Sequence, residues 1–537
     1  MNMTKPHRLL LALLALVVGV SLGACSSLSG VDGGGSQGAA SEELKGTTLR
    51  IVAATELKAL DSVVAQAAKD LGMTIEMAYP GGTLDNTERL GEGGFDGYYE
   101  ATWFATNRYA ELQGLGERFA STSSVATSPV LLGVRPTTAA ELGWDKTQPT
   151  WAEIAQAASS GALKFGMTDP GTSNSGFSAL ASVATSFADT GSALSTQDIA
   201  RVAPQVREFF SGQTVTSGSS GWLTTAFRSE TGKANAILSN EASLIDLKNQ
   251  GEDIDLIAPS DGVIFADYPL SALSTADQPL AKEKAQALAG WLEQHPQELA
   301  DAGLRPTTAG DSARNPDFAP GLLLEIPFPA SQDVVSALID SYNNDLRSPG
   351  AMAFMLDTSG SMAGDRIASL KATLHSLADG SAQVNGTSVG FRDREDITFV
   401  PFSTAVHDQR SLVFDAANAA TVGEVGSAIE ALDPSGDTAI YEALAAAYDH
   451  LGASASNIRS IVLMSDGELT AGRSFDDFRA YYEALPNQVK TIPTFVILYG
   501  EANAEEMTAL AELTGGKVFD AQRGDLASAF KEIRGYQ

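Results

Sequence analysis

The chain is poor in cysteine and histidine. Cys25 is the single cysteine among 537 residues, so no disulfide can form within the chain. Four of the five histidines lie beyond the amino-terminal segment, and their positions show none of the usual metal-ligand spacings: His295, His375, His407 and His450. These shortages argue against a disulfide scaffold and against a metal centre built from cysteine and histidine.

Basic residues are also scarce. The sequence has 35 Lys and Arg against 66 Asp and Glu, and loss of Lys5 and Arg8 with an amino-terminal signal leaves 33 against 66, a formal charge of −33. Such an acidic chain is a poor partner for nucleic acid, and anionic lipid headgroups would repel its surface. We therefore expect no nucleic-acid partner, and we expect any attachment to a membrane to depend on an anchor.

The first 24 residues have the pattern of a secretory signal peptide. Lys5 and Arg8 precede the apolar stretch Leu9 to Val20, which is short for a membrane span. The following Leu22-Gly23-Ala24-Cys25 resembles a bacterial lipobox. The resemblance implies cleavage before Cys25, lipidation of Cys25 and a protein held by its lipid anchor on the extracytoplasmic face of the cell membrane.

Residues 25–46 form the predicted link between that anchor and the folded chain. Ser26 to Gly46 are rich in Gly and Ser, a composition typical of a flexible tether. We expect folded structure from residue 47 onward.

The most informative motif is Asp357-Thr358-Ser359-Gly360-Ser361, directly after the buried-strand pattern Met352 to Leu356. In extended chain every second residue points the same way, so Asp357, Ser359 and Ser361 can line one side of a cup. A carboxylate and two hydroxyls are hard oxygen ligands, which favour Mg²⁺, with Mn²⁺ or Ca²⁺ as rivals. A polar loop after a strand is the alternative for this motif taken alone.

Two later segments supply further oxygen ligands. Thr438 lies in a loop that runs into a helix, and Asp466 follows the buried-strand pattern Ile461 to Met464. With these positions the sequence resembles a von Willebrand factor A domain, whose metal-ion-dependent adhesion site combines DxSxS, a loop Thr and a strand-end Asp in this order. The resemblance implies that Ser359, Ser361 and Thr438 approach the metal and that Asp357 and Asp466 coordinate it directly or through water. A degenerate site is the alternative.

The surrounding pattern favours an α/β fold with a doubly wound, mainly parallel, Rossmann-like sheet for residues 347–537. Strand patterns at Met352 to Leu356, Ile397 to Phe402, Ile461 to Met464 and Thr494 to Leu498 alternate with helical patterns. The proposed metal ligands follow strands, where open α/β sheets usually place ligands. Pro401 is discordant because proline cannot donate to a strand ladder, which suggests an edge or a bulge.

Residues 47–346 have a βα alternation of their own. The segments that follow, in this order, resemble a type II extracellular solute-binding protein: Thr48 to Thr55, Thr127 to Val134, Phe165 to Gly176, Phe265 to Leu270 and Gly303 to Pro306. The resemblance implies a two-lobed, periplasmic-binding-protein-like domain, with one lobe from about 47–130 plus 265–346, another from 131–264, and a cleft between them.

Candidate solute ligands lie at a predicted helix start. Ser173, Asn174 and Ser175 precede the apolar-periodic helix that begins near Phe177, and free amides there can receive a small polar or anionic solute. Helix capping by the same Ser and Asn side chains is an equal alternative. Thr55, at the first strand-to-helix turn, is a candidate contact from the other lobe.

The sequence gives no support for an enzyme. Gly386-Thr387-Ser388-Val389-Gly390 fits a GxSxG nucleophile pattern, but an elbow needs a strand before it and a helix after it, and a charged run leading to a strand follows instead. A metal site with an open position is better suited to binding, because a partner's Asp or Glu can fill that position without any bond being broken.

We therefore expect a surface lipoprotein that binds a protein partner through Mg²⁺ and carries a solute-binding-like domain. The alternative is the substrate-binding component of an ABC-type transport system, with the metal domain used for docking. A third interpretation makes the front domain a ligand-free scaffold. The short join Arg347 to Gly350 suggests that cleft closure on a solute alters how the metal face meets its partner.

Overall fold

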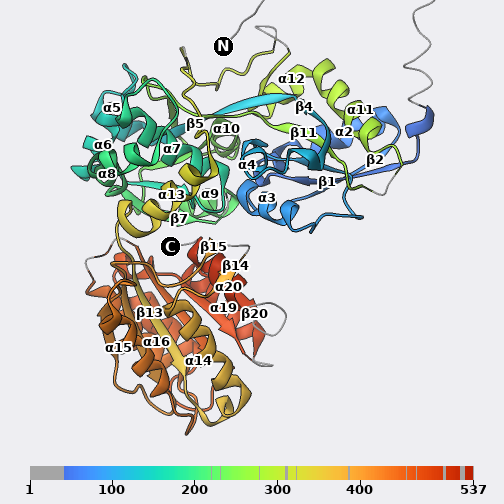
Figure 1. The fold of residues 1–537 in the computed structure, drawn as a ribbon. Helices are drawn as coiled ribbons and strands as arrows, with labels where there is room; N and C mark the ends of the chain where they lie inside the picture. Colours follow the sequence, from blue (N-terminus) through green and yellow to red (C-terminus); the bar gives the residue numbers. More distant parts are fainter. Residues whose placement is uncertain are drawn as a thin grey trace, which may run out of the picture. The chain divides into compact units, whose positions relative to one another are not determined.

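Figure 1 shows the computed structural model of the chain. The structure describes residues 42–535 except 219, 230–231, 277–278, 309–312, 322, 385–386, 455, 457, 467, 500–502 and 521–525. The predicted signal peptide, Cys25 and the predicted tether up to residue 41 lie outside the described residues. Residues Leu44–Gln537 form one compact unit. A search of the described residues finds no helix whose length and apolar character would suit a membrane span.

The first lobe is built around a mixed five-stranded sheet of order β2-β1-β3-β11-β4. β1 pairs in parallel with β2 and β3, while β11 runs antiparallel to β3 and β4. Leu49 and Ile51 of β1 are completely buried in the core of this lobe. The elements of the lobe are β1 (Thr48–Ala53), η1 (Thr55–Leu60), α2 (Asp61–Leu71), β2 (Thr74–Ala78), α3 (Thr83–Gly91), β3 (Ala101–Trp103), α4 (Arg108–Leu112), η2 (Gly116–Arg118), β4 (Phe119–Ser124), β11 (Pro269–Leu273), α11 (Ala281–Gln294) and α12 (Pro296–Asp301).

The second lobe has a seven-stranded sheet with the path β10-β5-β8-β6-β7, in which β9 and β12 also pair with β5. Its central parallel pairs are β6 with β7 and β6 with β8. The elements of the lobe are β5 (Ala126–Val134), α5 (Pro136–Leu142), α6 (Trp151–Ser159), β6 (Phe165–Thr168), α7 (Asn174–Ala188), α8 (Thr196–Phe210), β7 (Gln213–Ser217), α9 (Ser220–Ser229), β8 (Ala236–Asn240), α10 (Glu241–Asn249), β9 (Asp255–Ile257), β10 (Phe265–Ala266), β12 (Arg305–Pro306), α13 (Gln332–Ser341) and the π-helical η4 (Tyr342–Leu346).

The chain crosses between the two lobes at three places. One crossing joins β4 to β5, the second joins β10 to β11, and the third joins α12 to β12. The last helical segment of this region packs differently from the sequence prediction, which placed it with the first lobe. Val335 and Leu338 of α13 and Tyr342 of η4 lie in the hydrophobic core of the second lobe. Their apolar face is covered by α8 and α7, so residues 332–346 belong by packing to the second lobe.

The C-terminal domain, residues 347–537, has a six-stranded sheet of order β17-β16-β13-β18-β19-β20. All neighbours in it are parallel except the edge pair β16 and β17. Its elements are β13 (Ala351–Asp357), η5 (Gly360–Met362), α14 (Asp365–Ala378), β14 (Gln383–Val384), β15 (Thr387–Ser388), β16 (Asp396–Phe402), β17 (Arg410–Val413), α15 (Ala419–Glu430), α16 (Ile440–Gly452), β18 (Arg459–Ser465), α17 (Phe475–Ala484), α18 (Asn487–Lys490), β19 (Thr494–Leu498), α19 (Ala504–Thr514), β20 (Val518–Asp520) and α20 (Leu526–Arg534).

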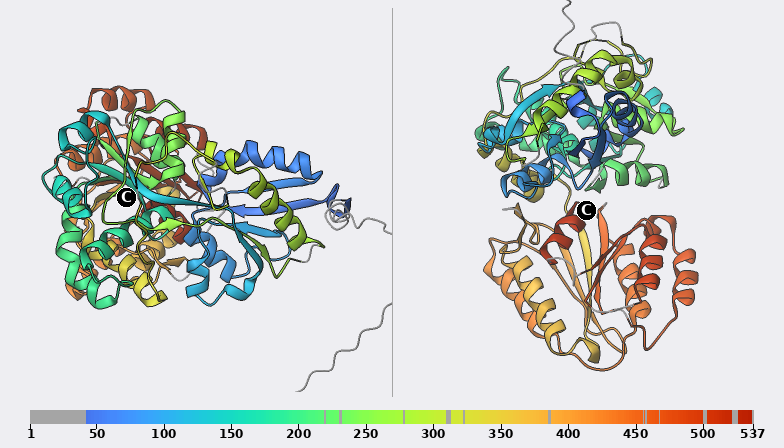
Figure 2. Two further views of the ribbon diagram at one scale, coloured as in Figure 1. Left: turned by 90° about the horizontal axis from the view of Figure 1, so that it is seen from above. Right: turned by 90° about the vertical axis from the view of Figure 1, so that its right-hand side faces the viewer.

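Helices cover both faces of this sheet, as the two further views show (Figure 2). Alternate residues of β13 pack against the helices on the two faces of the sheet, because side chains of a strand alternate between its faces. Met352, Phe354 and Leu356 pack with α14 and α15. Ala353 and Met355 pack with α16 and α17 on the other face. The predicted α/β class with a doubly wound, mainly parallel sheet is confirmed.

Candidate metal site and interlobe cleft

The DxSxS residues follow the central strand of the C-terminal sheet. β13 is hydrogen-bonded to β16 on one side and β18 on the other, and all seven of its residues are buried. The strand stops at Asp357, whose side chain is completely buried. Ser359 is buried as well, whereas Ser361, in the short helix η5, is exposed. The motif therefore runs from the sheet interior to the protein surface within five residues.

The carboxylate of Asp357 is held by hydrogen-bond donors on both oxygens. The Ser359 amide donates to Oδ1 at 2.8 Å, and the Ser465 hydroxyl donates to Oδ2 at 2.5 Å. Burial nevertheless raises the pKa of Asp357, and the nearby charge of Asp466 raises it further, while these hydrogen bonds act in the opposite direction. A cation placed here would relieve that electrostatic cost.

Two loops are tied together around the motif. The Gly360 amide donates to the Gly436 carbonyl at 2.9 Å, and the Ser435 amide donates to the Thr358 carbonyl at 2.7 Å. Gly436 has a φ of +78°, which favours glycine. These contacts bring the loop that carries Thr438 to the DxSxS turn. The hydroxyls of Ser359 and Ser361 are 3.0 Å apart.

Asp466 lies just after β18 and is 5% exposed. Its Oδ2 accepts a hydrogen bond from Arg366 Nη1 at 2.6 Å, and the same nitrogen donates to the Ser361 carbonyl at 3.2 Å. Among the residues that the structure describes, Asp466 Oδ1 has no hydrogen-bond partner. A buried carboxylate oxygen without a partner is costly, which marks a place for a donor or a cation.

These residues fit a divalent cation with oxygen ligands. Two buried carboxylates, from Asp357 and Asp466, and hydroxyls that lie close to them form a donor set suited to Mg²⁺ or Mn²⁺. Within the described ranges, no group of three or more His, Cys, Asp or Glu side chains could hold a metal. A cation held by Asp357 and Asp466 would therefore need Ser and Thr hydroxyls or water for its remaining contacts.

Sequence reasoning missed two residues of this centre, Arg366 and Ser465. Ser465 directly precedes Asp466 and orients the other carboxylate, that of Asp357. Arg366 lies in the first turn of α14 and joins the DxSxS turn to a residue 100 positions later in the chain. An arginine on the helix that follows the motif was a visible signal, but its partner depends on how the loops fold back.

The predicted solute ligands of the second lobe are buried at the start of α7. Ser173, Asn174 and Ser175 are 7%, 3% and 1% exposed. The Ser175 hydroxyl is 2.9 Å from that of Thr168 and 3.2 Å from that of Ser173. Ser173 occupies the N-cap position, but its side chain makes no capping hydrogen bond within the described residues. The capping alternative therefore does not describe Ser173.

A first-lobe tyrosine reaches this helix start. Tyr109 of α4 donates a hydrogen bond to Asn174 Oδ1 at 3.2 Å. The backbones of the two lobes also touch, because a Cβ added to Gly82 would lie 2.2 Å from the Thr172 carbonyl oxygen. The two lobes are therefore closed on each other at this level.

On the first lobe Thr55 begins η1, but its neighbour Glu56 makes the contact with the second lobe. Glu56 Oε1 accepts hydrogen bonds from Asn240 Nδ2 at 3.1 Å and from the Tyr268 hydroxyl at 3.2 Å. Burial raises the pKa of Glu56. Sequence reasoning missed Glu56, Asn240 and Tyr268 because nothing in their spacing relates one to another.

The C-terminal domain thus defines a class of protein module: a doubly wound sheet with two aspartates and several hydroxyls at the carboxyl ends of its strands. Residues 352–532 match the family model of the von Willebrand factor type A domain. The predicted identity of this domain is confirmed.

Comparison with solved structures gives similar proteins for both regions. The periplasmic binding protein P5PA is 14% identical and matches 56% of this chain and 100% of its own, with a TM-score of 0.42. A periplasmic thiamin binding protein is 14% identical over 55% of this chain and 95% of its own, with a TM-score of 0.43. A von Willebrand factor type A protein from Catenulispora acidiphila is 19% identical over 36% of this chain and 43% of its own, with a TM-score of 0.27. No curated protein matches.

Proposed function

We propose that the C-terminal domain binds a protein partner through a divalent cation, Mg²⁺ or Mn²⁺, held by Asp357, Ser359, Ser361, Thr438 and Asp466. The observation that carries the proposal is the unpartnered Oδ1 of Asp466, 5% exposed and close to the carboxylate of Asp357. A bound cation of this type keeps an open coordination position that an Asp or Glu of a partner can fill. Binding of this kind breaks no bond, and we propose no enzymatic activity.

The chain's own residues prepare the site for such a ligand. Ser465 and the Ser359 amide fix the direction of the Asp357 carboxylate. Arg366 has to leave Asp466 Oδ2 before both oxygens of that carboxylate become available. Because the Arg366 side chain is 42% exposed, it can turn to solvent or toward an acidic partner without disturbing the core.

We further propose that the protein works on the extracytoplasmic face of a membrane, held by lipid on Cys25. The support is the amino-terminal sequence, with its charged start, short apolar stretch and Leu22 to Cys25 motif. Capture of a small solute between the lobes, alone or as part of a transport system, stays a prediction. The contacts between Gly82 and Thr172 mean that the lobes must separate before a solute can enter.

The test is a titration of the full chain with Mn²⁺ and Mg²⁺ by calorimetry, together with an Asp466→Ala variant. We expect one saturable site in the native chain and loss of that site in the variant. Asp476→Ala is the matched control, because Asp476 lies in the same domain with a side chain that is 88% exposed. At about 100 times the dissociation constant, the metal should stabilise the native fold by about 2.7 kcal/mol.

The open coordination position can be tested separately with Mn²⁺ as a probe. Water-proton relaxation reports the waters on bound Mn²⁺, and acetate offers the carboxylate that a partner would supply. We expect acetate to displace water from the protein-bound ion. Equal metal affinity in the native chain and in Asp466→Ala would contradict the proposed ligands, and relaxation unaffected by acetate would contradict the proposed partner chemistry.

A further inference from the structure

A cluster of buried charges joins the second lobe to the C-terminal domain and contains more positive than negative groups. We define the junction cluster as three guanidinium groups and two carboxylates: Arg347, Arg392, Arg534, Asp169 and Glu395. Arg534 Nη1 contacts both oxygens of Glu395, at 2.7 and 2.9 Å. Arg392 Nη2 lies 3.6 Å from Asp169 Oδ2, longer than a hydrogen bond. Glu395 is thus committed to Arg534, and Asp169 compensates Arg392 only weakly.

Arg347 is the least compensated member of the junction cluster. The residue is 2% exposed, and within the described part of the chain neither Nη1 nor Nη2 has a hydrogen-bond partner. The ring of Tyr342 lies with its centroid 5.8 Å from the guanidinium carbon, and Glu395 and Asp169 act on Arg347 only through their charges, without a hydrogen bond to Nη1 or Nη2. Burial, and next to it the charge of Arg392, lowers the pKa of Arg347. A buried guanidinium whose Nη1 and Nη2 make no hydrogen bond is costly, and three cations share two carboxylates, so the cluster attracts negative charge.

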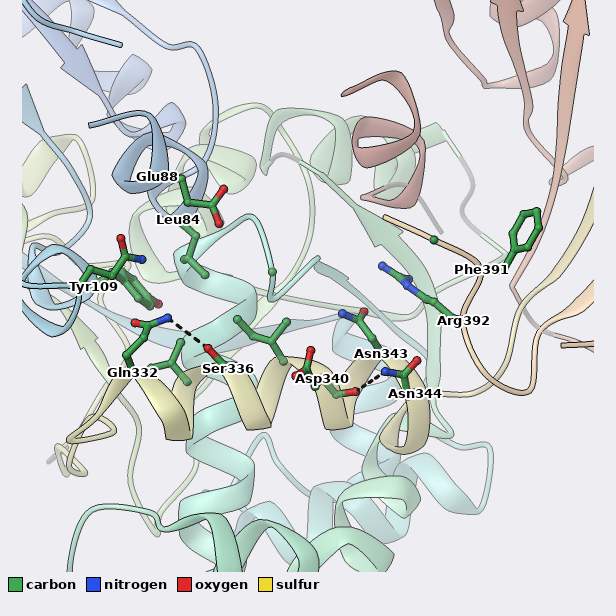
Figure 3. A pocket seen from close by; sticks show the side chains of 15 residues that line it. Leu84, Glu88, Tyr109, Gln332, Ser336, Asp340, Asn343, Asn344, Phe391 and Arg392 are labelled. Carbon is green, nitrogen blue, oxygen red and sulfur yellow. Dashed lines mark hydrogen bonds between the residues drawn. The ribbon is translucent and has the colours of Figure 1, made fainter. Parts of the chain in front are cut away.

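A cavity of about 260 Å³ lies against Arg392 (Figure 3). α13 and η4 form one wall, where the side chains of Asp340 and Asn343 line the cavity, and Arg392 approaches from the C-terminal domain. Arg392 Nη1 and Asn343 Oδ1 have no hydrogen-bond partner among the described residues. The cavity therefore offers a cation and an amide that can both make new hydrogen bonds.

The acidic side chains that line the cavity limit which anions can bind there. Glu88, on the far wall, is neutralised by Lys531 Nζ at 3.0 Å. Asp340 is exposed and has no such cation in contact among the residues described, so it can accept a hydrogen bond from a ligand. An anion that keeps a hydroxyl hydrogen satisfies Arg392 and Asp340 together, whereas a fully deprotonated anion would meet repulsion at Asp340.

We propose that this cavity binds a phosphate group, with its oxygens against Arg392 and its remaining hydroxyl directed to Asp340. The net positive charge of the junction cluster, to which Arg347 contributes, adds long-range attraction behind Arg392. Since Arg392 comes from the C-terminal domain and Asp340 from α13, a bound phosphate bridges the two regions of the chain. This site is separate from the proposed metal centre and does not depend on it.

The experiment is calorimetric titration of the metal-free full chain at constant ionic strength and about pH 6, where a phosphate monoester still keeps a hydroxyl hydrogen in part, with inorganic phosphate, glycerol 3-phosphate or sulfate. We expect saturable binding of phosphate and no comparable binding of sulfate. Tighter binding of the monoester would identify a small phosphorylated solute as the ligand, and binding of inorganic phosphate alone would identify the free ion. Sulfate binding as tight as phosphate binding would overturn the assignment.

Two variants and a control locate the site. Arg392→Gln should weaken phosphate binding about tenfold or more. Asp340→Ala, at an exposed position where the fold is not at risk, should remove the preference for phosphate over sulfate. Arg479→Gln, in the same domain with a side chain that is 46% exposed, should bind as the native chain does. Unchanged phosphate affinity in folded Arg392→Gln, or no saturable binding to the native chain, would overturn the proposal.

Discussion

The carboxylates of the proposed metal centre and those at the contact between the lobes have different partners. At the metal centre Asp466 is paired with a cationic side chain that is 42% exposed, and Ser361 next to it is also exposed. Between the lobes Glu56 accepts hydrogen bonds from two neutral donors, Asn240 of the second lobe and Tyr268 of the first-lobe core, and Asn174 accepts one from Tyr109. The first arrangement can admit a ligand after one side chain moves. The second can admit one only after two lobes move apart.

This contrast separates two ways in which a site can be closed to its ligand. A ligand that enters a site closed by one arginine must break one ion pair. A ligand that enters between closed lobes must break all the contacts across the cleft. A ligand can shift an equilibrium between two states only by its difference in affinity for them. We therefore expect the metal centre to respond to ions at fixed domain geometry, and the cleft to respond through a change of geometry.

The largest expected effect comes from forcing the cleft open. Gly82 has an extended backbone conformation that alanine also adopts, with φ −70° and ψ 170°, but its new Cβ would lie 2.2 Å from the Thr172 carbonyl oxygen. Gly82→Ala should therefore disfavour the closed lobes by about 1–3 kcal/mol, as overpacking does elsewhere. Small-angle X-ray scattering should show an increased radius of gyration.

The control for this variant is Gly116→Ala in η2 of the same lobe, where an added Cβ meets no atom of the described structure within 4 Å. Its scattering should match that of the native chain. Metal binding should also be the same in Gly82→Ala and in the native chain if the two sites respond independently. A compact Gly82→Ala protein would show that the contact with Thr172 does not hold the lobes together.

The sequence predicted the C-terminal domain better than the cleft for a physical reason. The strand patterns that begin at Met352, Ile397, Ile461 and Thr494 correspond to β13, β16, β18 and β19, because a short continuous apolar run is local information in the sequence. Pro401 is not on an edge strand as expected. β16 is internal, but β17 pairs with it only as far as Phe399, and beyond that point the Pro401 carbonyl accepts a hydrogen bond from the His407 amide at 2.9 Å, so the missing N–H of proline is tolerated there.

Local sequence patterns could not predict which side chains meet across loops or lobes. Ser173, Asn174 and Ser175 could be placed at a helix start, but not beneath Tyr109, because that contact depends on how two separate sheets come together. For the same reason the sequence could suggest Thr55 but not its neighbour Glu56. The helix α13 was assigned to the first lobe from its position in the chain, whereas its apolar face packs on the second.

The next effect is expected at the metal centre, from removal of the competing cation. Arg366→Gln should tighten divalent-ion binding by about fivefold, or about 1 kcal/mol, because the ion no longer displaces a hydrogen-bonded guanidinium from Asp466. Calorimetry with Mn²⁺ measures the change. Raising the salt concentration should weaken the advantage of the variant, since salt screens the native ion pair.

Arg479→Gln serves as the charge-matched control for Arg366→Gln. It removes the same charge from the same domain, at a side chain 46% exposed and paired with Asp476. The control separates loss of the contact with Asp466 from a general change in the domain's charge. If both variants bound Mn²⁺ equally, the effect would be one of net charge, and Arg366 would not be a competitor for the site.

The smallest effect is expected from Glu56, because this half-buried carboxylate keeps some contact with solvent. Burial in the closed lobes raises the pKa of Glu56 above its ordinary value, so the closed form binds the proton more readily than an opened or unfolded form does. The closed form should therefore become more stable relative to the open form as the pH falls through the raised pKa of Glu56. Its stability should not increase further below about pH 4.5. Above the raised pKa the ionised Glu56 carboxylate opposes closure.

Glu56→Gln removes this dependence while keeping an oxygen that can accept from Asn240. The variant should be as compact at neutral pH as the native chain is at about pH 4.5, and its scattering should change less between these conditions. Glu92→Gln, at an exposed position of the same lobe, should keep the native pH response. A Glu56→Gln protein with the native pH response would assign the effect to other carboxylates and remove Glu56 from the closure of the cleft.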